Sequence, residues 1–265
     1  MEVLEISLGQ VFLSEAVGSM LLLLLGGGVV ANTLLKGSKG QGTGWLLINL
    51  GWGLAVFAGV LVSGASGAHI NPAVTVGIIA RNGILDQPDF VPGVAIGVVS
   101  TLVYFGGQLL GAMVGAGLMW LTYKQHFDAE ENPAFKLGVF STGPEIRNYF
   151  WNTITEIIGT FVLVFVIFAS GIFTANSGGD PVNLGWLGAL GVGLLVVGIG
   201  ASLGGPTGYA INPTRDLGPR IMHALLPIKG KGTSDWGYAW VPIVGPLIGG
   251  VLGGVASTFL LVSSV

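Results

Sequence analysis

An internal repeat with a spacing of 141 residues is the feature of this sequence that most restricts its fold. The dipeptide Asn71-Pro72 recurs as Asn212-Pro213, 141 residues later. The residue pairs that share this spacing also include Glu15 and Glu156, Gly18 and Gly159, Gly64 and Gly205, Gly67 and Gly208, and Ile70 and Ile211. Agreement at so many positions is improbable by chance, so we expect the two halves of the chain to fold alike.

The composition indicates that both halves lie in a membrane. Charged residues make up 9% of the 265 residues, whereas soluble domains carry about 25%. So few charges could not cover the surface of a soluble enzyme, and a net charge of −3 does not favour nucleic acid. The absence of cysteine excludes a disulfide-stabilised secreted scaffold. We therefore expect a multi-pass membrane protein, and the lack of a targeting segment suits a bacterial inner membrane.

Six apolar segments are long enough to cross a bilayer, at about 20 residues per helix. They cover residues 10–34, 45–63, 92–122, 148–174, 183–203 and 237–262. Two further apolar segments, Asn71–Ala80 and Asn212–Leu226, are too short to cross, and each follows a glycine-rich stretch. The sequence thus predicts a single transmembrane channel domain over residues 1–265, with two repeats at about 10–122 and 148–262.

Each repeat contains three full spans, and this odd number turns the second repeat upside down relative to the first. Such inverted-topology repeats are typical of transporters and channels. The two short Asn-Pro segments then enter from opposite faces and meet near the middle of the membrane.

The Asn-Pro dipeptides suit the start of a short helix. Proline fits the first helical turn, and asparagine caps it by accepting a backbone N–H, which leaves the side-chain NH₂ free to donate. Two helix N-termini at the midplane would also repel cations. The backbone before each short helix must be extended, and in a membrane its carbonyls must line a polar cavity. We expect these carbonyls to come from Gly67, Ala68, His69 and Gly208.

The segments around these dipeptides, Ser66–Thr75 and Gly208–Asp216, resemble the two signature loops of the aquaporin family. The resemblance extends over nearly the whole chain. It implies an all-α membrane protein with six transmembrane helices and two re-entrant half-helices, forming a homotetramer with one pore per subunit and binding no cofactor and no metal. The central pore motifs would be Asn71, Pro72 and Ala73 in the first loop and Asn212, Pro213 and Thr214 in the second, where Thr214 replaces an alanine.

The residues after the second signature resemble the glycerol-facilitator branch of that family. Asp216 follows Arg215, with a basic residue at Arg220, whereas water-selective members usually carry a small residue after that arginine. The resemblance implies a selectivity filter made of Trp52, Gly200, Tyr209 and Arg215.

Two departures from the family pattern concern this filter. Tyr209 stands where glycerol facilitators have phenylalanine and adds a hydroxyl at the narrowest point. We therefore expect Tyr209→Phe to change the ratio of glycerol to water permeability. The interval from Trp52 to Asn71 is one residue shorter than in the family, which leaves Gly51 as an alternative to Trp52.

Ionisable residues inside a membrane protein are rare and are usually bonded to other protein groups. We expect Glu15 and Glu156 each to accept backbone N–H bonds from the irregular loop of its own repeat, and Asp216 to be buried. The alternatives are a proton relay through the two glutamates and a structural pair between Arg215 and Asp216. His69 is expected to pack its ring, with a role as a pH sensor as the alternative.

Together these features predict a passive channel for small neutral solutes, with glycerol first and water, similar polyols or protonated short acids as further solutes. No nucleotide-binding motif is present, which agrees with downhill passage, and no nucleophile–base or metal set indicates an enzyme. The alternatives are a water-selective channel and a proton-coupled transporter of a small polar solute.

Two arguments predict opposite orientations in the membrane. The family resemblance implies cytoplasmic termini, which leaves Arg81 as the main inner cation. The basic residues that would then lie outside are Lys36, Lys39, Lys124, Lys136, Arg147, Lys229 and Lys231. The positive-inside rule favours the reverse. We give precedence to the resemblance because it covers the whole chain.

Overall fold

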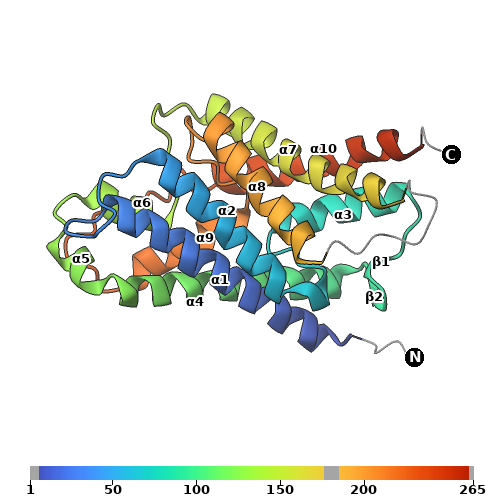
Figure 1. Cartoon of the computed structure of the whole chain (residues 1–265), viewed down its shortest axis with the longest axis horizontal. Coiled ribbons are helices and arrows are strands. Elements are labelled where there is room, and N and C mark those ends of the chain that lie inside the picture. The colour runs from blue at the N-terminus through green and yellow to red at the C-terminus, as the bar shows by residue number, and fades with distance from the viewer. Residues whose placement is uncertain (1–5, 176–184, 263–265) are drawn as a thin grey trace.

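The fold consists of six long apolar helices packed side by side, with two short helices between them (Figure 1). The structure is a computed structural model and describes residues 6–175 and 185–262. The long helices are α1 (Leu8–Leu34), α2 (Trp45–Val62), α4 (Val98–Thr122), α7 (Tyr149–Ala175), α8 (Trp186–Leu203) and α10 (Val241–Val262). All six contain stretches long and apolar enough to cross a membrane, which confirms the predicted all-α membrane fold.

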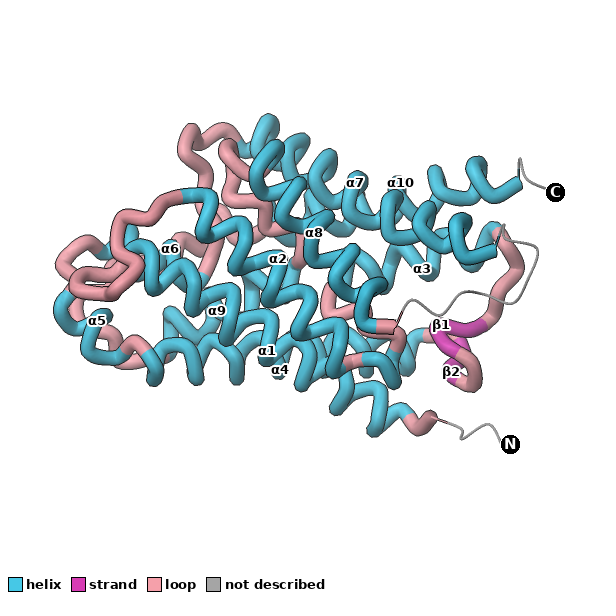
Figure 2. The backbone as a smooth tube through the Cα atoms, viewed as in Figure 1, coloured by secondary structure: helices cyan, strands magenta, loops and turns pink. Residues whose placement is uncertain are grey.

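Two half-helices, α3 (Pro72–Ile84) and α9 (Pro213–Leu225), follow the two Asn-Pro dipeptides. In both, the proline occupies the first turn and the preceding asparagine is the N-cap. A short 3₁₀ turn, η1 (Gly64–Ser66), precedes the first. The tube in Figure 2 shows α3 and α9 in opposite halves of the molecule, each reached through a loop.

The helix boundaries differ from the predicted ones mainly before α4. The third span is predicted from residue 92, but α4 begins at Val98; the residues before it form a small antiparallel hairpin, β1 (Asp89–Val91) paired with β2 (Val94–Ala95). Gly93, with φ +84°, lies in its turn. The connection 123–147 also contains two short helices, α5 (Lys124–Ala129) and α6 (Pro133–Phe140). The expected start at 183 lies outside the described residues, and α10 begins four residues later than predicted.

Glycines bring the helices of each repeat into backbone contact. A Cβ atom on Gly111 of α4 would lie 2.1 Å from the carbonyl oxygen of Ala16 in α1. In the second repeat, a Cβ atom on Gly249 of α10 would lie 2.4 Å from the carbonyl oxygen of Ile157 in α7. Because any larger residue would separate these helices, the glycines explain how each pair packs so closely.

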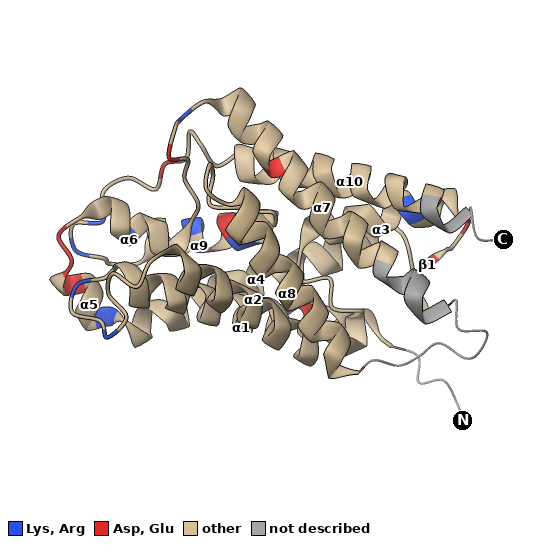
Figure 3. Ribbon diagram, turned by 45° about the horizontal axis from the view of Figure 1, so that its top comes forward, with Lys and Arg blue, Asp and Glu red and all other residues tan. Residues whose placement is uncertain are grey.

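Many of the charged residues lie toward the two ends of the helix bundle (Figure 3). Lys and Arg gather near α5 and α6, at the end opposite to the one where α1 begins and α10 ends. Inside the bundle, the charged groups include Glu15, Glu156, Asp216 and Arg220, all of them almost completely buried. These buried charged groups mark the polar part of an otherwise apolar bundle.

Candidate functional site: a pore between the two repeats

Asn71 and Asn212 join the two repeats at the centre of the molecule. The Nδ2 atom of Asn71 donates to the carbonyl oxygen of Ile211 at 2.8 Å, and that of Asn212 donates to Ile70 at 2.9 Å. Each Oδ1 atom accepts a backbone N–H of its own half-helix, from Ala73 in α3 and from Thr214 and Arg215 in α9. Each side-chain NH₂ thus donates one N–H across the repeat boundary to a backbone carbonyl. The second N–H of each amide is left to donate elsewhere.

The backbone before each asparagine adopts the left-handed conformation at matching positions. Ala68 and Ile70 have φ +54° and +43°, and Tyr209 and Ile211, 141 residues later, have φ +39° and +44°. This conformation is costly for residues other than glycine, and most of all for a β-branched isoleucine. The strain must be offset by surrounding contacts, and it recurs where the chain changes from loop to half-helix.

Glu15 and Glu156 supply those contacts. The Glu15 carboxylate accepts the backbone N–H groups of His69 at 3.0 Å and Ile70 at 2.6 Å. In the second repeat, Glu156 accepts those of Ala210 at 3.0 Å and Ile211 at 2.8 Å. Both carboxylates also accept a hydroxyl, from Ser66 and Thr207 respectively. Each glutamate therefore holds the strained loop of its own repeat.

Several carbonyl oxygens of these loops accept no hydrogen bond from the protein residues that the structure describes. Among residues 6–175 and 185–262, no hydrogen bond is made to the carbonyls of Gly67, Ala68, His69 or Gly208. The first three residues line one cavity and Gly208 lines another. Free acceptors in a chain that crosses a membrane are tolerated where they face a polar path.

Two cavities share part of their lining inside the molecule. The central cavity, of about 250 Å³, is lined by both asparagines and by the loop 67–71. The end cavity, of about 580 Å³, opens beside α6 and is lined by Phe135 and Arg147. Three residues line both cavities: Trp52, Tyr209 and Arg215. These three residues therefore form the boundary between the cavities.

Trp52 and Arg215 lie face to face at this boundary. The Cζ atom of Arg215 lies 3.9 Å from the centre of the Trp52 ring system. Trp52 fits because Gly26 of α1 has no side chain; a Cβ atom there would lie 2.3 Å from the ring. Gly51, the alternative for this place, lies against Val29 instead and lines neither cavity. No hydrogen bond joins the Arg215 guanidinium to another described residue, so its donors remain available.

Tyr209 packs its ring against Trp45 and Gly200. The rings of Trp45 and Tyr209 meet edge to face, 5.7 Å apart, and Nε1 of Trp45 donates to the carbonyl oxygen of Gly200. Gly200 lines neither cavity because the Tyr209 ring covers it, so it differs from its expected place in the filter wall. The Tyr209 hydroxyl is buried rather than exposed at the boundary.

Comparison with known proteins agrees with this architecture. A model of the family described as "Major intrinsic protein" matches residues 2–257. The chain belongs to the major intrinsic protein family. It is 50% identical over 236 residues to a glycerol uptake facilitator protein of Streptococcus pneumoniae, covering 89% of this chain and 92% of that one. A glycerol uptake facilitator protein of Bacillus subtilis is 49% identical over 246 residues, with 92% and 82% covered.

A solved structure also resembles this major intrinsic protein. The aquaglyceroporin of Plasmodium falciparum superposes with a TM-score of 0.75 and 34% sequence identity, covering 94% of both chains.

In this major intrinsic protein, Asp216 pairs with Arg220 rather than with Arg215. The Arg220 guanidinium donates to both Asp216 oxygens, at 2.8 and 3.1 Å, and to the carbonyl oxygens of Thr142 and Ser234. Asp216 also accepts the backbone N–H and hydroxyl of Thr142. The sequence did not indicate Thr142, because it lies 74 residues away in a loop without a motif. The network holds that loop next to α9 and hence next to Arg215.

The ring of His69 is packed inside the first repeat. It stacks on Tyr104 with centroids 4.2 Å apart, and its Nδ1 atom lies 3.1 Å from the hydroxyl of Thr75. Gln108 donates to both Thr75 and Glu15, which links the ring to the buried carboxylate. This arrangement favours a structural ring over a solvent-facing pH sensor.

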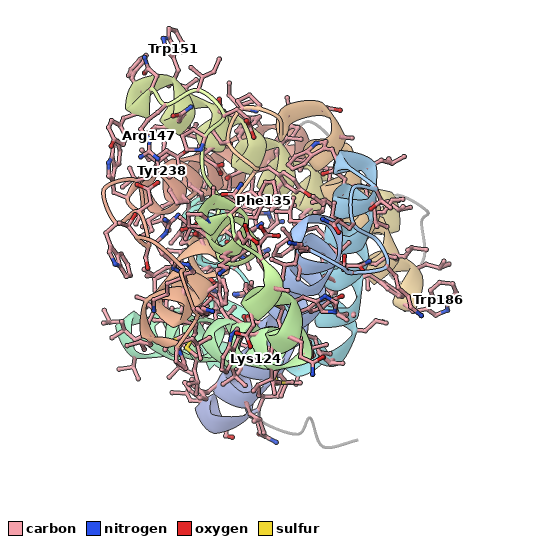
Figure 4. All side chains as sticks on the ribbon, turned by 90° about the vertical axis from the view of Figure 1, so that its left-hand side faces the viewer. Lys124, Phe135, Arg147, Trp151, Trp186 and Tyr238 are labelled. Carbon is pink, nitrogen blue, oxygen red and sulfur yellow. The ribbon has the colours of Figure 1, made fainter. Side chains whose placement is uncertain are left out.

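The mouth of the end cavity in this major intrinsic protein carries an ion pair. Figure 4 looks onto this end and shows Arg147 beside Tyr238; the Arg147 Cζ atom lies 5.1 Å from the Tyr238 ring centre. Arg147 donates to both carboxylate oxygens of Asp235, at 3.1 and 2.6 Å. These bonds raise the pKa of the Arg147 guanidinium, so its charge is permanent. Both charged residues line the cavity mouth, which no sequence motif indicated.

Proposed function

We propose that this major intrinsic protein is a passive channel for glycerol, with water and other small neutral polyols or protonated short acids as further solutes. The observation that carries the proposal is the boundary at which two cavities share Trp52, Tyr209 and Arg215. A flat aromatic surface beside a guanidinium suits a solute with a carbon backbone on one side and hydroxyls on the other. The glycerol uptake facilitator relatives and the aquaglyceroporin support the same solute.

The central cavity offers hydrogen bonds along the rest of the path. The carbonyls of Gly67, Ala68 and His69 accept solute hydroxyls, and the remaining N–H of Asn71 and Asn212 donates to them. The positive ends of α3 and α9 lie at these asparagines and disfavour cations. A neutral solute can therefore exchange its water shell for protein groups, whereas a cation meets unfavourable charge at Arg215 and again at the two helix ends.

We further propose that the chain is one channel domain built from two inverted repeats, at about 10–122 and 148–262. The matching bonds of Glu15 and Glu156 support this division. Proton coupling through these glutamates is disfavoured, because both are buried, fully bonded and absent from the lining of either cavity.

Stopped-flow light scattering on proteoliposomes tests the channel function. Glycerol, water and a protonated short acid are compared, each with and without a pH gradient. We expect glycerol permeability well above that of empty vesicles, with no response to the gradient. Glycerol permeability equal to that of empty vesicles, with water permeability raised, would instead indicate a water-selective channel. Saturation together with a response to the gradient would indicate a coupled transporter.

We propose a homotetramer with one pore per subunit, following the family resemblance. Apolar side chains exposed on the outer faces of the helices, such as Leu54 and Leu102, are available to lipid or to neighbouring subunits. Native mass spectrometry from detergent should give four times the subunit mass of 27.1 kDa. A single subunit under conditions that preserve glycerol transport would contradict the tetramer.

We propose a bacterial inner membrane as the location, with cytoplasmic termini. The chain has no cysteine, so a single introduced thiol reports its own side of the membrane. Gln125 in α5 and Gln87 before β1 are both exposed and lie at opposite ends of the molecule. In intact cells an impermeant maleimide should label Gln125→Cys and spare Gln87→Cys. The reverse pattern would support the orientation favoured by the positive-inside rule.

A further inference from the structure

Two buried polar atoms behind the cavity boundary have no hydrogen-bond partner among the described residues. They are the Oδ1 atom of Asn49 in α2 and the hydroxyl of Tyr209. Asn49 is 1% exposed and Tyr209 is 4% exposed, so solvent does not satisfy either group. A buried polar group without a partner is costly, and two such groups near each other indicate a missing pairing.

Both atoms lie over the same glycine. A Cβ atom on Gly200 would lie 2.5 Å from Oδ1 of Asn49 and 2.9 Å from the hydroxyl oxygen of Tyr209. The same Cβ atom would lie 2.6 Å from the ring carbon that carries the hydroxyl. The absence of a side chain at Gly200 is therefore what lets the asparagine and the tyrosine approach each other behind the boundary.

Their chemistry is complementary. A tyrosine hydroxyl rotates freely and donates one hydrogen bond, and an asparagine Oδ1 atom accepts. The two atoms do not bond in the structure as it stands. We infer that Asn49 is a positioning residue for the channel: a small movement of the two side chains over Gly200 lets the Tyr209 hydroxyl donate to Oδ1 of Asn49, and this bond holds the Tyr209 ring at the boundary. The hydroxyl then bonds to a protein group rather than to the solute. Asn49 precedes Trp52 by three residues, so one turn of α2 carries one boundary residue and the anchor of another.

This inference rests on the proposed glycerol function and gives Tyr209 a different role from the one its sequence position suggested. A hydroxyl facing the solute would make Tyr209→Phe alone change selectivity. If Asn49 holds the hydroxyl, the loss of Asn49 should change selectivity more than Tyr209→Phe does. Without Asn49 the buried hydroxyl can form a hydrogen bond only if the Tyr209 ring moves toward the cavities.

A double-mutant cycle tests the pairing, with Asn49→Leu, Tyr209→Phe and the double variant in proteoliposomes. We expect Asn49→Leu to shift the glycerol-to-water permeability ratio by at least about threefold, since an unpaired buried hydroxyl is costly. Adding Tyr209→Phe should return the ratio to within about twofold of the wild type, because phenylalanine has no hydroxyl to satisfy. Asn49→Ala replaces Asn49→Leu in the cycle if the leucine variant does not insert.

Asn152→Leu is the matched control. Asn152 is a similarly buried asparagine of α7, whose amide bonds to the backbone of Asn148 and Ile146. Its substitution should lower stability without changing the permeability ratio. The inference is overturned if Asn49→Leu leaves the ratio unchanged, or if its effect and that of Tyr209→Phe simply add.

The thermal unfolding midpoints of the same variants in detergent give a second readout that does not depend on transport. The two substitutions should again be non-additive, with the double variant more stable than the sum of the single effects requires. If the wild type proves impermeable to glycerol, the proposed function fails. The pairing is then still judged by this unfolding cycle, where additive effects reject it.

Discussion

At the scale of single residues, the shape of the path depends on glycines, whose lack of a side chain leaves room for larger neighbours. Trp52 reaches the boundary because Gly26 leaves room for its ring, and Tyr209 reaches it because Gly200 does the same. The positions of these two cavity-lining side chains therefore depend on neighbouring glycines that line neither cavity. A substitution at such a glycine should act on transport even though the solute never touches it.

Gly26→Ala tests this dependence. The new Cβ atom would lie 2.3 Å from the Trp52 ring, so the ring must shift at the boundary. Overpacking costs about 1–3 kcal/mol. If a cost of this size raises the barrier to passage at the boundary, we expect glycerol permeability to drop roughly tenfold. Stopped-flow scattering measures the change. Gly28→Ala, on the same helix with open space around it, should leave permeability unchanged; equal losses in both variants would contradict the prediction.

Each buried glutamate stabilises a strained isoleucine in the loop of its own repeat. Each carboxylate accepts the N–H of one left-handed isoleucine, Ile70 or Ile211, and of the residue before it, and no solvent is available to replace these bonds.

Glu156→Gln should therefore destabilise the protein by about 1–3 kcal/mol, because an amide NH₂ would face backbone donors that need an acceptor. A lower unfolding midpoint in detergent is the expected observation. Glu145→Gln, at an exposed loop position, is the control and should change the midpoint little. A Glu156 variant as stable as this control would show that the loop holds its conformation without the carboxylate.

At the scale of elements, the repeats are held together by backbone contacts between whole helices. In the first repeat α4 crosses α1 at Gly107, Gly111 and Gly115, and in the second α10 crosses α7 at Gly245, Gly249 and Gly253. Dispersion contacts at this distance replace the hydrophobic driving force that lipid does not provide. The half-helices depend on these pairs, because α3 also packs against Gly250 and Gly254 of α10.

Gly111→Ala should separate α1 from α4. Its Cβ atom would lie 2.1 Å from the carbonyl oxygen of Ala16, a backbone atom that cannot move aside. We expect a loss of at least about 1–3 kcal/mol in stability, measured as a lower unfolding midpoint and poorer insertion. Gly117→Ala lies on the same helix and meets only the flexible end of Met222 at 3.5 Å, so it should be tolerated. Equal stability of the two variants would argue against close packing at Gly111.

At the scale of the whole molecule, the loops at the α5–α6 end are tied together by Glu130. Its carboxylate accepts the backbone N–H groups of Lys36, Glu131 and Asn132, and thereby joins the end of α1 to the segment before α6. Burial raises the pKa of Glu130, but these N–H donors and the charge of Lys136 outweigh it and leave the pKa below its ordinary value.

The stabilisation by Glu130 should therefore depend on pH on the acid side. Because the folded pKa lies below the unfolded value of about 4.3, the stabilisation is complete above that value. It is lost as the pH falls through the folded pKa. The unfolding midpoint of the wild type should exceed that of Glu130→Gln at pH 7, and the gap should narrow as the pH falls below the unfolded value and through the lower folded pKa. Glu131→Gln, whose side chain is 89% exposed, should show no such gap; a gap that widens in acid would contradict the assignment.

Much of this protein could be predicted from local sequence signals. The six apolar segments confirm the membrane class, and the repeat predicted two half-helices that begin at Asn71 and Asn212, where the structure has them. These features follow from hydropathy, from proline and asparagine at a helix start, and from a fixed spacing, all of which are properties of the chain itself. The hairpin before α4 escaped prediction because each of its strands is only two or three residues long, too short to give a periodic pattern.

Tertiary structure alone decided which groups meet. The sequence left Trp52 and Gly51 as alternatives, and the space beside Gly26 put Trp52 at the boundary. The tertiary structure also paired Asp216 with Arg220 and Thr142 and placed Asn49 and Tyr209 over the same glycine, because contacts between distant segments depend on how helices pack rather than on their order. The sequence by itself determined the membrane, the repeat and the half-helices, since these are local. The shape of the path depended on contacts that exist only once the two repeats lie against each other.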